Sequence, residues 1–173
     1  MKAVRCCDKQ VQVVDIPAPS GEGVRVKVAS AGICSSDLHM IDAGFPLLAT
    51  LGHEVAGTLS DGRAVALEPI APCGHCDMCV QGDYHLCRLG PGMVHGVALD
   101  GGMAEQMLVP ERCIVPLPNN VSAADACLVE PLTEYLQVSR TRDPRVLGDL
   151  AKVWRDLEGA VLVTEHRNRN AGY

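Results

Sequence analysis

The chain has 173 residues, enough for about one domain with a hydrophobic core but short for two. Its 15 basic and 21 acidic residues give a net charge of -6, which argues against a nucleic-acid partner, because phosphate binding needs a basic surface. No apolar run approaches the roughly 20 residues of a membrane span, and the N-terminal residues lack a signal-peptide pattern. We therefore expect a cytoplasmic protein without a membrane partner.

The first 60 residues predict a β-rich start to the chain. Valine-rich runs at 11–14 and 24–28 have the composition of short strands and are bounded by turn-forming residues. Further strands are predicted at 64–70 and at 103–109, the latter after an Asp-Gly-Gly turn. This succession of short strands predicts a barrel or a sandwich.

The sequence takes on a helical composition only from Ser122, which can cap a helix running toward Gln137. A polar connection follows at 139–146. Leucines and a tryptophan within 147–158 then share one helical face, Gly159 ends that helix, and 160–164 has the pattern of a closing strand. We interpret 147–164 as a return to the same domain and 165–173 as a polar tail.

Four of the nine cysteines lie close together with the spacing C-x2-C-x2-C-x7-C: Cys73, Cys76, Cys79 and Cys87. Four clustered thiolates can wrap one tetrahedral zinc ion and turn a loop into a rigid lobe. The odd cysteine count and the absence of a signal pattern also fit free thiolates in a reducing compartment better than disulfides. The sequence therefore predicts a structural zinc site in a lobe at about 72–90.

One alternative for this loop is a redox dithiol formed by Cys73 and Cys76. Such a pair typically follows a strand and opens a helix in a βαβ unit. Here Pro72 and Gly74 break the backbone and two more cysteines follow, so the spacing favours zinc.

A second set of metal-ligand residues is scattered along the chain. Cys34, His53 and Glu130 belong to the short motifs Gly-Ile-Cys, Gly-His-Glu and Val-Glu-Pro. A catalytic zinc takes three protein ligands of these types and leaves a fourth position open. Spacing cannot bring three separate segments together, and each residue alone is more often a core thiol, a satisfied histidine or a solvated carboxylate.

The order of the motifs resembles a zinc-dependent medium-chain alcohol dehydrogenase over residues 1 to about 135. It runs from Gly-Ile-Cys-x-Ser-Asp-x-His through Gly-His-Glu and the four-cysteine loop to Asp-Gly-Gly-x-Ala-Glu and Glu-Pro-Leu. The Glu-Pro variant is similar to the polyol branch, which includes sorbitol and threonine dehydrogenases. The resemblance implies a mostly β (α+β) fold, a GroES-like β-barrel catalytic domain at 1–138 with a zinc-binding lobe and a few helices.

The resemblance also implies roles for individual residues. Cys34, His53 and Glu130 match the protein ligands of the catalytic zinc, and Glu54 matches a neighbour that can approach the metal. The hydroxyl of Ser36 matches the group that accepts the substrate proton, and two nearby residues match supporting roles. His39 falls where an imidazole can continue the relay, and Asp37 where a carboxylate orients the loop. Together with the four-cysteine site, two zinc ions per chain are expected.

The family holds NAD or NADP in a separate Rossmann-type domain, and the glycine signature of that domain is missing here. The nearest approach begins at Gly90 but lacks the third glycine and follows the cysteine loop instead of a strand. The family's cofactor domain would begin shortly after Glu130. We therefore interpret 139–146 as the place where that domain is absent, and the oligomeric state, which the domain usually supports, stays open.

Two functions remain open on the sequence. The first is the catalytic domain of an NAD(P)-linked alcohol or polyol dehydrogenase, active only when a dinucleotide-binding domain is supplied. The second is a zinc-binding GroES-like module with a structural or partner-binding role and no turnover.

Overall fold

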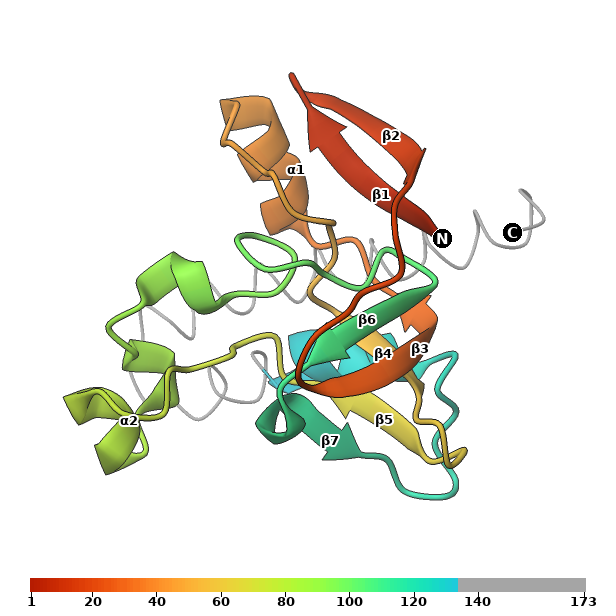
Figure 1. Ribbon diagram of the computed structural model, residues 1–173, viewed down its shortest axis with the longest axis vertical. Coiled ribbons are helices and arrows are strands. Elements are labelled where there is room, and N and C mark those ends of the chain that lie inside the picture. Colours follow the sequence, from red (N-terminus) through yellow and green to blue (C-terminus); the bar gives the residue numbers. More distant parts are fainter. Residues whose placement is uncertain (134–173) are drawn as a thin grey trace, which may run out of the picture. The chain divides into compact units, whose positions relative to one another are not determined.

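A computed structural model of the protein describes residues 1–133, of which 1–130 form one compact unit (Figure 1). The predicted connection at 139–146, the helix and strand at 147–164 and the tail at 165–173 lie outside the described residues. Within residues 1–133, no helix has the length and apolar character needed to cross a bilayer.

The centre of the unit is an antiparallel sheet of five strands in the order β6-β3-β4-β5-β7 (Figure 1). It curls into a half-barrel, with a β-bulge in β3 between Val28 and Ser30. The strands in chain order are β3 Val24–Ala31, β4 Val55–Thr58, β5 Ala64–Leu67, β6 Gln106–Val109 and β7 Ile114–Pro116.

Aliphatic side chains from the sheet form the main core, as expected for a chain with 3% aromatic residues. In β3, Val26 is fully buried between the exposed Arg25 and Lys27, which is the alternation that a half-buried strand requires. Met107 of β6 and Val65 of β5 are also almost completely buried in this cluster. Each such side chain contributes about 1.5–3 kcal/mol through its removal from water.

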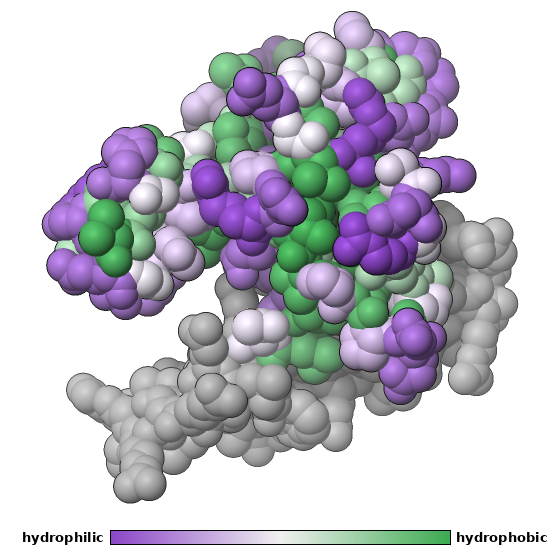
Figure 2. All heavy atoms as spheres, turned by 60° about the horizontal axis from the view of Figure 1, so that its bottom comes forward, coloured by the Kyte–Doolittle hydropathy of each residue, from purple (hydrophilic) through white to green (hydrophobic). Residues whose placement is uncertain are grey.

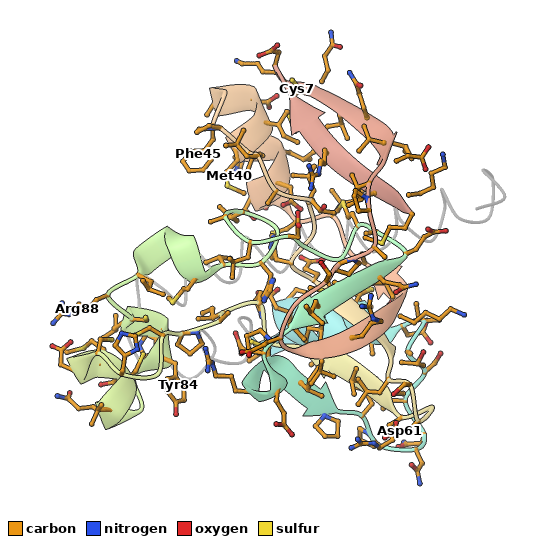
Figure 3. The ribbon with its side chains drawn as sticks, in the orientation of Figure 1. Cys7, Met40, Phe45, Asp61, Tyr84 and Arg88 are labelled. Atoms are coloured by element: carbon orange, nitrogen blue, oxygen red, sulfur yellow. The ribbon has the colours of Figure 1, made fainter. Side chains whose placement is uncertain are left out.

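A separate hairpin precedes the sheet. Strands β1 Lys2–Cys7 and β2 Gln10–Asp15 are joined by a two-residue turn, in which both Asp8 and Lys9 have positive φ. This is the backbone conformation of the type I′ turn that matches strand twist. Figure 3 shows Cys7 at the tip of the hairpin. Backbone hydrogen bonds of Val4 with Leu51 and Met103 hold β1 to the rest of the unit.

Two α-helices and several 3-10 turns complete the described chain. Helix α1 Ser35–Ala43 ends where Gly44 adopts a left-handed conformation with φ 71°, and Figure 3 shows Met40 and Phe45 at that end. Helix α2 Asp77–Gln81 lies in the four-cysteine lobe, at one side of the sheet in Figure 1. The 3-10 turns are Tyr84–Leu86, Gly90–Met93, Glu111–Cys113 and Ala126–Leu128.

The fold class predicted from the sequence is confirmed: the described chain is mostly β with a few helices. The predicted strands at 11–14 and 24–28 lie within β2 and β3. The strand predicted at 64–70 ends at Leu67, and the one predicted at 103–109 begins at Gln106.

The expectation that helix appears only late in the chain was wrong. Residues 35–43 form α1, which buries only Asp37 and therefore lacks the apolar stripe that would have revealed it. The helix predicted from Ser122 also begins later. Residues 122–125 form a turn in which Ser122 accepts hydrogen bonds from Ala124, Asp125 and Ala126, and α-helical backbone starts at Val129.

Candidate metal centres

Two groups of metal-ligating side chains come together in the described part of the chain. One ligand atom from each of Cys34, His53 and Glu54 lies within 4.8 Å of the other two, although Cys34 is separated in the chain from the adjacent pair His53 and Glu54. The four sulfur atoms of the lobe likewise lie within 4.8 Å of one another.

Cys34 is positioned as the N-cap of α1. Its Sγ accepts a hydrogen bond from the backbone N–H of Ser36 at 3.5 Å, and its own N–H donates to Oδ2 of Asp37 at 3.1 Å. The second bond is one half of a capping box, and the backbone N–H of Asp37 donates to the Cys34 side chain in the other half, with a thiol in the place usually taken by a hydroxyl.

Asp37 also faces the second member of the group. Its Oδ1 forms an ion pair with Nδ1 of His53 at 3.4 Å, and neither atom has a well-aligned hydrogen-bond partner among residues 1–133. Asp37 is 2% exposed, so its carboxylate acts on His53 with little screening by water. The hydrogen bond with Asp37 is the main cause that raises the pKa of His53 to about 9, with a smaller contribution from Cys34, while burial opposes the shift.

Glu54 is buried and lies against a glycine. Gly32, two residues before Cys34, donates its N–H to the backbone oxygen of Glu54 at 2.8 Å. A Cβ atom on Gly32 would lie only 1.9 Å from Oε2 of Glu54. The absence of a side chain at Gly32 therefore lets the carboxylate occupy its place beside Cys34.

The lobe holds its four thiols through its own backbone. Cys76 donates its N–H to Sγ of Cys73 at 3.3 Å, and Cys73 donates to Sγ of Cys87 at 3.4 Å. The Sγ atoms of Cys73 and Cys79 are 3.8 Å apart. Zinc–sulfur bonds of about 2.3 Å would place the sulfurs of a regular tetrahedron about 3.8 Å apart, so this spacing fits a zinc ion.

The electrostatics of the lobe favour thiolates on two of the four ligands. Backbone N–H groups, that of Arg88 first among them, lower the pKa of Cys76 to about 6. The N–H of Cys73 similarly lowers the pKa of Cys87, whereas burial raises the pKa of Cys79 to about 12. Arg88, labelled in Figure 3, also forms a bidentate ion pair with Asp77 at 2.6 and 3.0 Å.

These donor sets differ in what they can do. Four thiolates fill a tetrahedral shell and suit a closed structural site, and a redox dithiol would not require Cys79 and Cys87 to converge with the other two. One thiolate, one imidazole and one carboxylate leave a fourth position open, which is the composition of a catalytic zinc site. Both sets fit zinc.

The structure brings only some of the predicted residues of the open site together. Cys34 and His53 meet, but the carboxylate that joins them in the described chain is Glu54, and Glu130 is not in the group. Ser36 and His39 lie one turn apart on α1, and both are exposed. The contact of Gly32 with Glu54 was not predicted from the sequence, although the glycine two residues before Cys34 was a signal for it.

Known proteins resemble the chain in sequence and in structure. Residues 20–119 match the family described as Alcohol dehydrogenase GroES-like domain. An uncharacterized zinc-type alcohol dehydrogenase-like protein, YdjJ of Escherichia coli K12, is 33% identical over 147 residues, covering 75% of this chain and 42% of its own length. A sorbitol dehydrogenase of Halalkalibacterium halodurans is 33% identical over 135 residues, 70% of this chain and 39% of that enzyme.

A solved structure agrees with these relatives. The crystal structure of a short chain alcohol dehydrogenase (rspB) from Escherichia coli CFT073, complexed with NADH, is similar with a TM-score of 0.71 at 34% identity. It covers 80% of this chain and 44% of that protein. The chain thus spans about two fifths of the length of the curated relatives it matches. Because the family match covers more than half of the sequence, the chain belongs to the alcohol dehydrogenase GroES-like domain family.

Proposed function

We propose that this chain is the catalytic domain of a zinc-dependent, NAD(P)-linked dehydrogenase of alcohols or polyols. The observation that carries the proposal is that Cys34 at the start of α1 meets the adjacent residues His53 and Glu54 of a second segment in one open set of candidate ligands. The four-cysteine lobe would hold a second, structural zinc ion.

Zinc, when bound by Cys34, His53 and a carboxylate, supplies the Lewis acidity that favours an alkoxide from an alcohol at neutral pH. The remaining contributions come from the chain itself. Asp37 faces Nδ1 of His53 and so leaves Nε2 as the nitrogen for the metal. Its second oxygen holds the backbone of Cys34, so one buried carboxylate positions two of the three ligands.

Two carboxylates are candidates for the third ligand. Glu54 lies beside Cys34 and His53, whereas Glu130 is the residue that the family resemblance assigns. We propose that Glu54 holds this position in the arrangement described here and that Glu130 remains a candidate ligand. Replacing each by Gln and measuring zinc affinity distinguishes them.

Proton transfer is assigned to α1. We propose that the hydroxyl of Ser36 accepts the proton of the substrate hydroxyl and that His39, exposed one turn further along the helix, passes it to water. The hydride acceptor would be NAD or NADP held by a dinucleotide-binding domain, because hydride transfer requires contact between nicotinamide and substrate. Such a domain, in cis or as a separate partner, would be needed for turnover.

The first test is the zinc content of the purified 173-residue chain. Two equivalents are expected, falling to one in Cys34→Ala and to one in Cys76→Ala, with a different site lost in each variant. His85→Ala is a matched control, because His85 is exposed in the lobe and should leave both equivalents in place. One equivalent that survives Cys34→Ala but is lost in Cys76→Ala would contradict the catalytic site.

The second test separates an enzyme from a binding module. The chain is mixed with NAD or NADP and a panel of polyols, and cofactor reduction is followed by absorbance. Reduction by the unmodified chain that is lost in Cys34→Ala would exclude the non-catalytic module. Two bound zinc ions without reduction would instead exclude unaided catalysis and require an added dinucleotide-binding domain.

A further inference from the structure

Besides the chain that runs through β4 and β5, a second segment connects the four-cysteine lobe to the loop that carries His53. This segment, residues 93–103, is called the strap below. It leaves the lobe six residues after Cys87 and ends in the Asp-Gly-Gly-Met sequence that precedes β6. Neither end of the strap supplies a member of the two ligand groups.

The first end of the strap is anchored in the lobe. Met93 is 4% exposed and belongs to the small core that contains Cys79 and Cys87. Its backbone oxygen accepts a hydrogen bond from Ala71 at 2.8 Å, just before the first lobe cysteine. The position of Met93 therefore depends on how the four thiols are packed.

The second end holds the residues immediately before His53. The N–H groups of Gly101, Met103 and Gly102 donate to the backbone oxygens of Thr50, Leu51 and Gly52, respectively, at 2.8 to 2.9 Å. The N–H of Thr50 in turn donates to Oδ1 of Asp100 at 2.8 Å. Each residue of the segment 50–52 thus has a hydrogen bond to the strap.

The contact between the two segments is backbone against backbone. A Cβ atom on Gly101 would lie 2.2 Å from the oxygen of Gly52, and one on Gly96 would lie 2.7 Å from the carbonyl carbon of Gly52. Only glycine permits this approach. A displacement of the strap would therefore be transmitted to Gly52, the neighbour of His53.

His95 links the two ends of the strap. Its backbone N–H donates to Pro69 on the lobe side at 2.9 Å, and its ring Nδ1 lies 2.9 Å from the backbone oxygen of Asp100. A carbonyl oxygen can only accept, so Nδ1 carries the hydrogen. The side chain is 5% exposed, so water cannot readily replace this bond.

We propose that the strap couples the two metal centres, so that metal in the four-cysteine lobe positions His53 and strengthens zinc binding by Cys34, His53 and Glu54. In this arrangement His95 and Gly101 are positioning residues for His53, and neither touches the metal. The inference rests on the proposed function, because it assumes that both groups bind zinc. Coupling of this kind is reciprocal, so metal at His53 also stabilises the loaded lobe.

The main test measures zinc binding by competition with a chromophoric chelator on the full chain. The titration step that is lost in Cys34→Ala belongs to the open site. Emptying the lobe with Cys76→Ala should weaken that step by about 5- to 150-fold, the typical range of coupling between two sites. Hydrogen exchange in the peptide spanning 99–105 should also become faster, because the amides that hold 50–52 are released.

Variants of the strap test whether the coupling passes through this segment, because they leave the four lobe cysteines unchanged. His95→Leu removes the ring donor and should weaken the open site by a similar factor, whereas His95→Asn retains a side-chain N–H near the same place and should restore most of the affinity. Gly101→Ala should act like His95→Leu. Gly92→Ala is its matched control, because a Cβ there meets no atom within 4 Å.

The outcomes distinguish the inference from the proposed function. If the unmodified chain binds no zinc at Cys34, the proposed function fails. If it binds two ions and the open site keeps its affinity in Cys76→Ala and in His95→Leu, the coupling is wrong and the proposed function stands. If Gly101→Ala does not fold, the comparison of His95→Leu with His95→Asn decides alone.

Discussion

Asp37 contacts two members of the candidate open metal site. It is buried in α1, accepts the N–H of Cys34 and faces Nδ1 of His53. A carboxylate behind a ligating imidazole sets which ring nitrogen meets the metal and raises its basicity. The residue thus links the start of a helix with a ligand from a distant loop.

Replacing Asp37 by Asn should lower the zinc affinity of the open site by about 10- to 100-fold, because the amide cannot supply the negative charge beside His53. Chelator competition measures the loss. Asp42→Asn is the control, since Asp42 lies exposed on the same helix and should leave the affinity unchanged. Equal affinities in the two variants would contradict the role assigned to Asp37.

His95 should make the stability of the protein depend on pH. Burial lowers its pKa from the ordinary value of 6.5, with the nearby Asp100 acting in the opposite direction. Below pH 6.5 the unfolded chain therefore binds a proton that the folded chain does not, so this contribution to stability is complete above pH 6.5 and declines as the pH falls.

The measurement is the urea midpoint of the unmodified chain and of His95→Asn from pH 8 to pH 5, both with saturating zinc. The midpoint of the unmodified chain should fall more steeply below pH 6.5, because the variant has no imidazole to protonate. Parallel curves would exclude a contribution from His95.

At the scale of elements, the position of α1 in the chain is determined by the caps at its two ends more than by packing of an apolar face. Among its residues only Asp37 is buried, so the capping box at Cys34 and the left-handed Gly44 set where the helix begins and ends. Such a helix has no apolar face to reveal it in the sequence. The signals were present as Cys-x-x-Asp and Gly44, but a cysteine is an unusual N-cap.

Gly44→Ala should destabilise the protein by about 1 kcal/mol, because alanine is strained at φ 71°. The added Cβ would also lie 3.1 Å from Cε of Lys9. Gly44→Asn should cost less, since asparagine tolerates the left-handed region better. Urea unfolding of both variants checks the order, and a reversed order would show that crowding at Lys9 outweighs backbone strain.

At the scale of the whole molecule, polar and apolar regions alternate over the surface shown in Figure 2, where hydrophobic residues form a band between hydrophilic ones. A hydrophobic patch also appears on the lobe at the left of that view. Exposed large side chains in this part of the chain are Val80, Tyr84, Leu86 and Leu89. The buried core of the lobe is small, consisting of Cys79, Cys87 and Met93, so we expect the order of the lobe to depend on a bound metal ion.

Zinc should therefore stabilise the whole chain. Free zinc at 100 times its dissociation constant adds about 2.7 kcal/mol for each site that binds only in the folded state. Thermal unfolding with added zinc and with a chelator measures the difference, and Cys76→Ala should lose the contribution of the lobe site. Magnesium is the control ion, because thiolates bind it poorly.

Much of this protein could be read from local sequence. The cysteine spacing predicts the lobe, since cysteines with two residues between them meet through local turns of the backbone. The valine alternation in 24–28 predicts β3 with its buried Val26. The family resemblance predicted that Cys34 and His53 belong to one site, and their ligand atoms lie within 4.8 Å of each other. These features depend on neighbouring residues or on motif order.

Long-range packing decided the remainder. Among the described residues, Glu54 and not Glu130 lies with Cys34 and His53, and the missing side chain at Gly32 leaves room for its carboxylate. Asp37 of α1 meets His53 from a separate part of the chain. The strap contacts residues 50–52 through backbone hydrogen bonds and through glycines that lie more than 40 residues away in the chain. No spacing rule predicts such contacts, because they depend on how the sheet and the loops close in three dimensions.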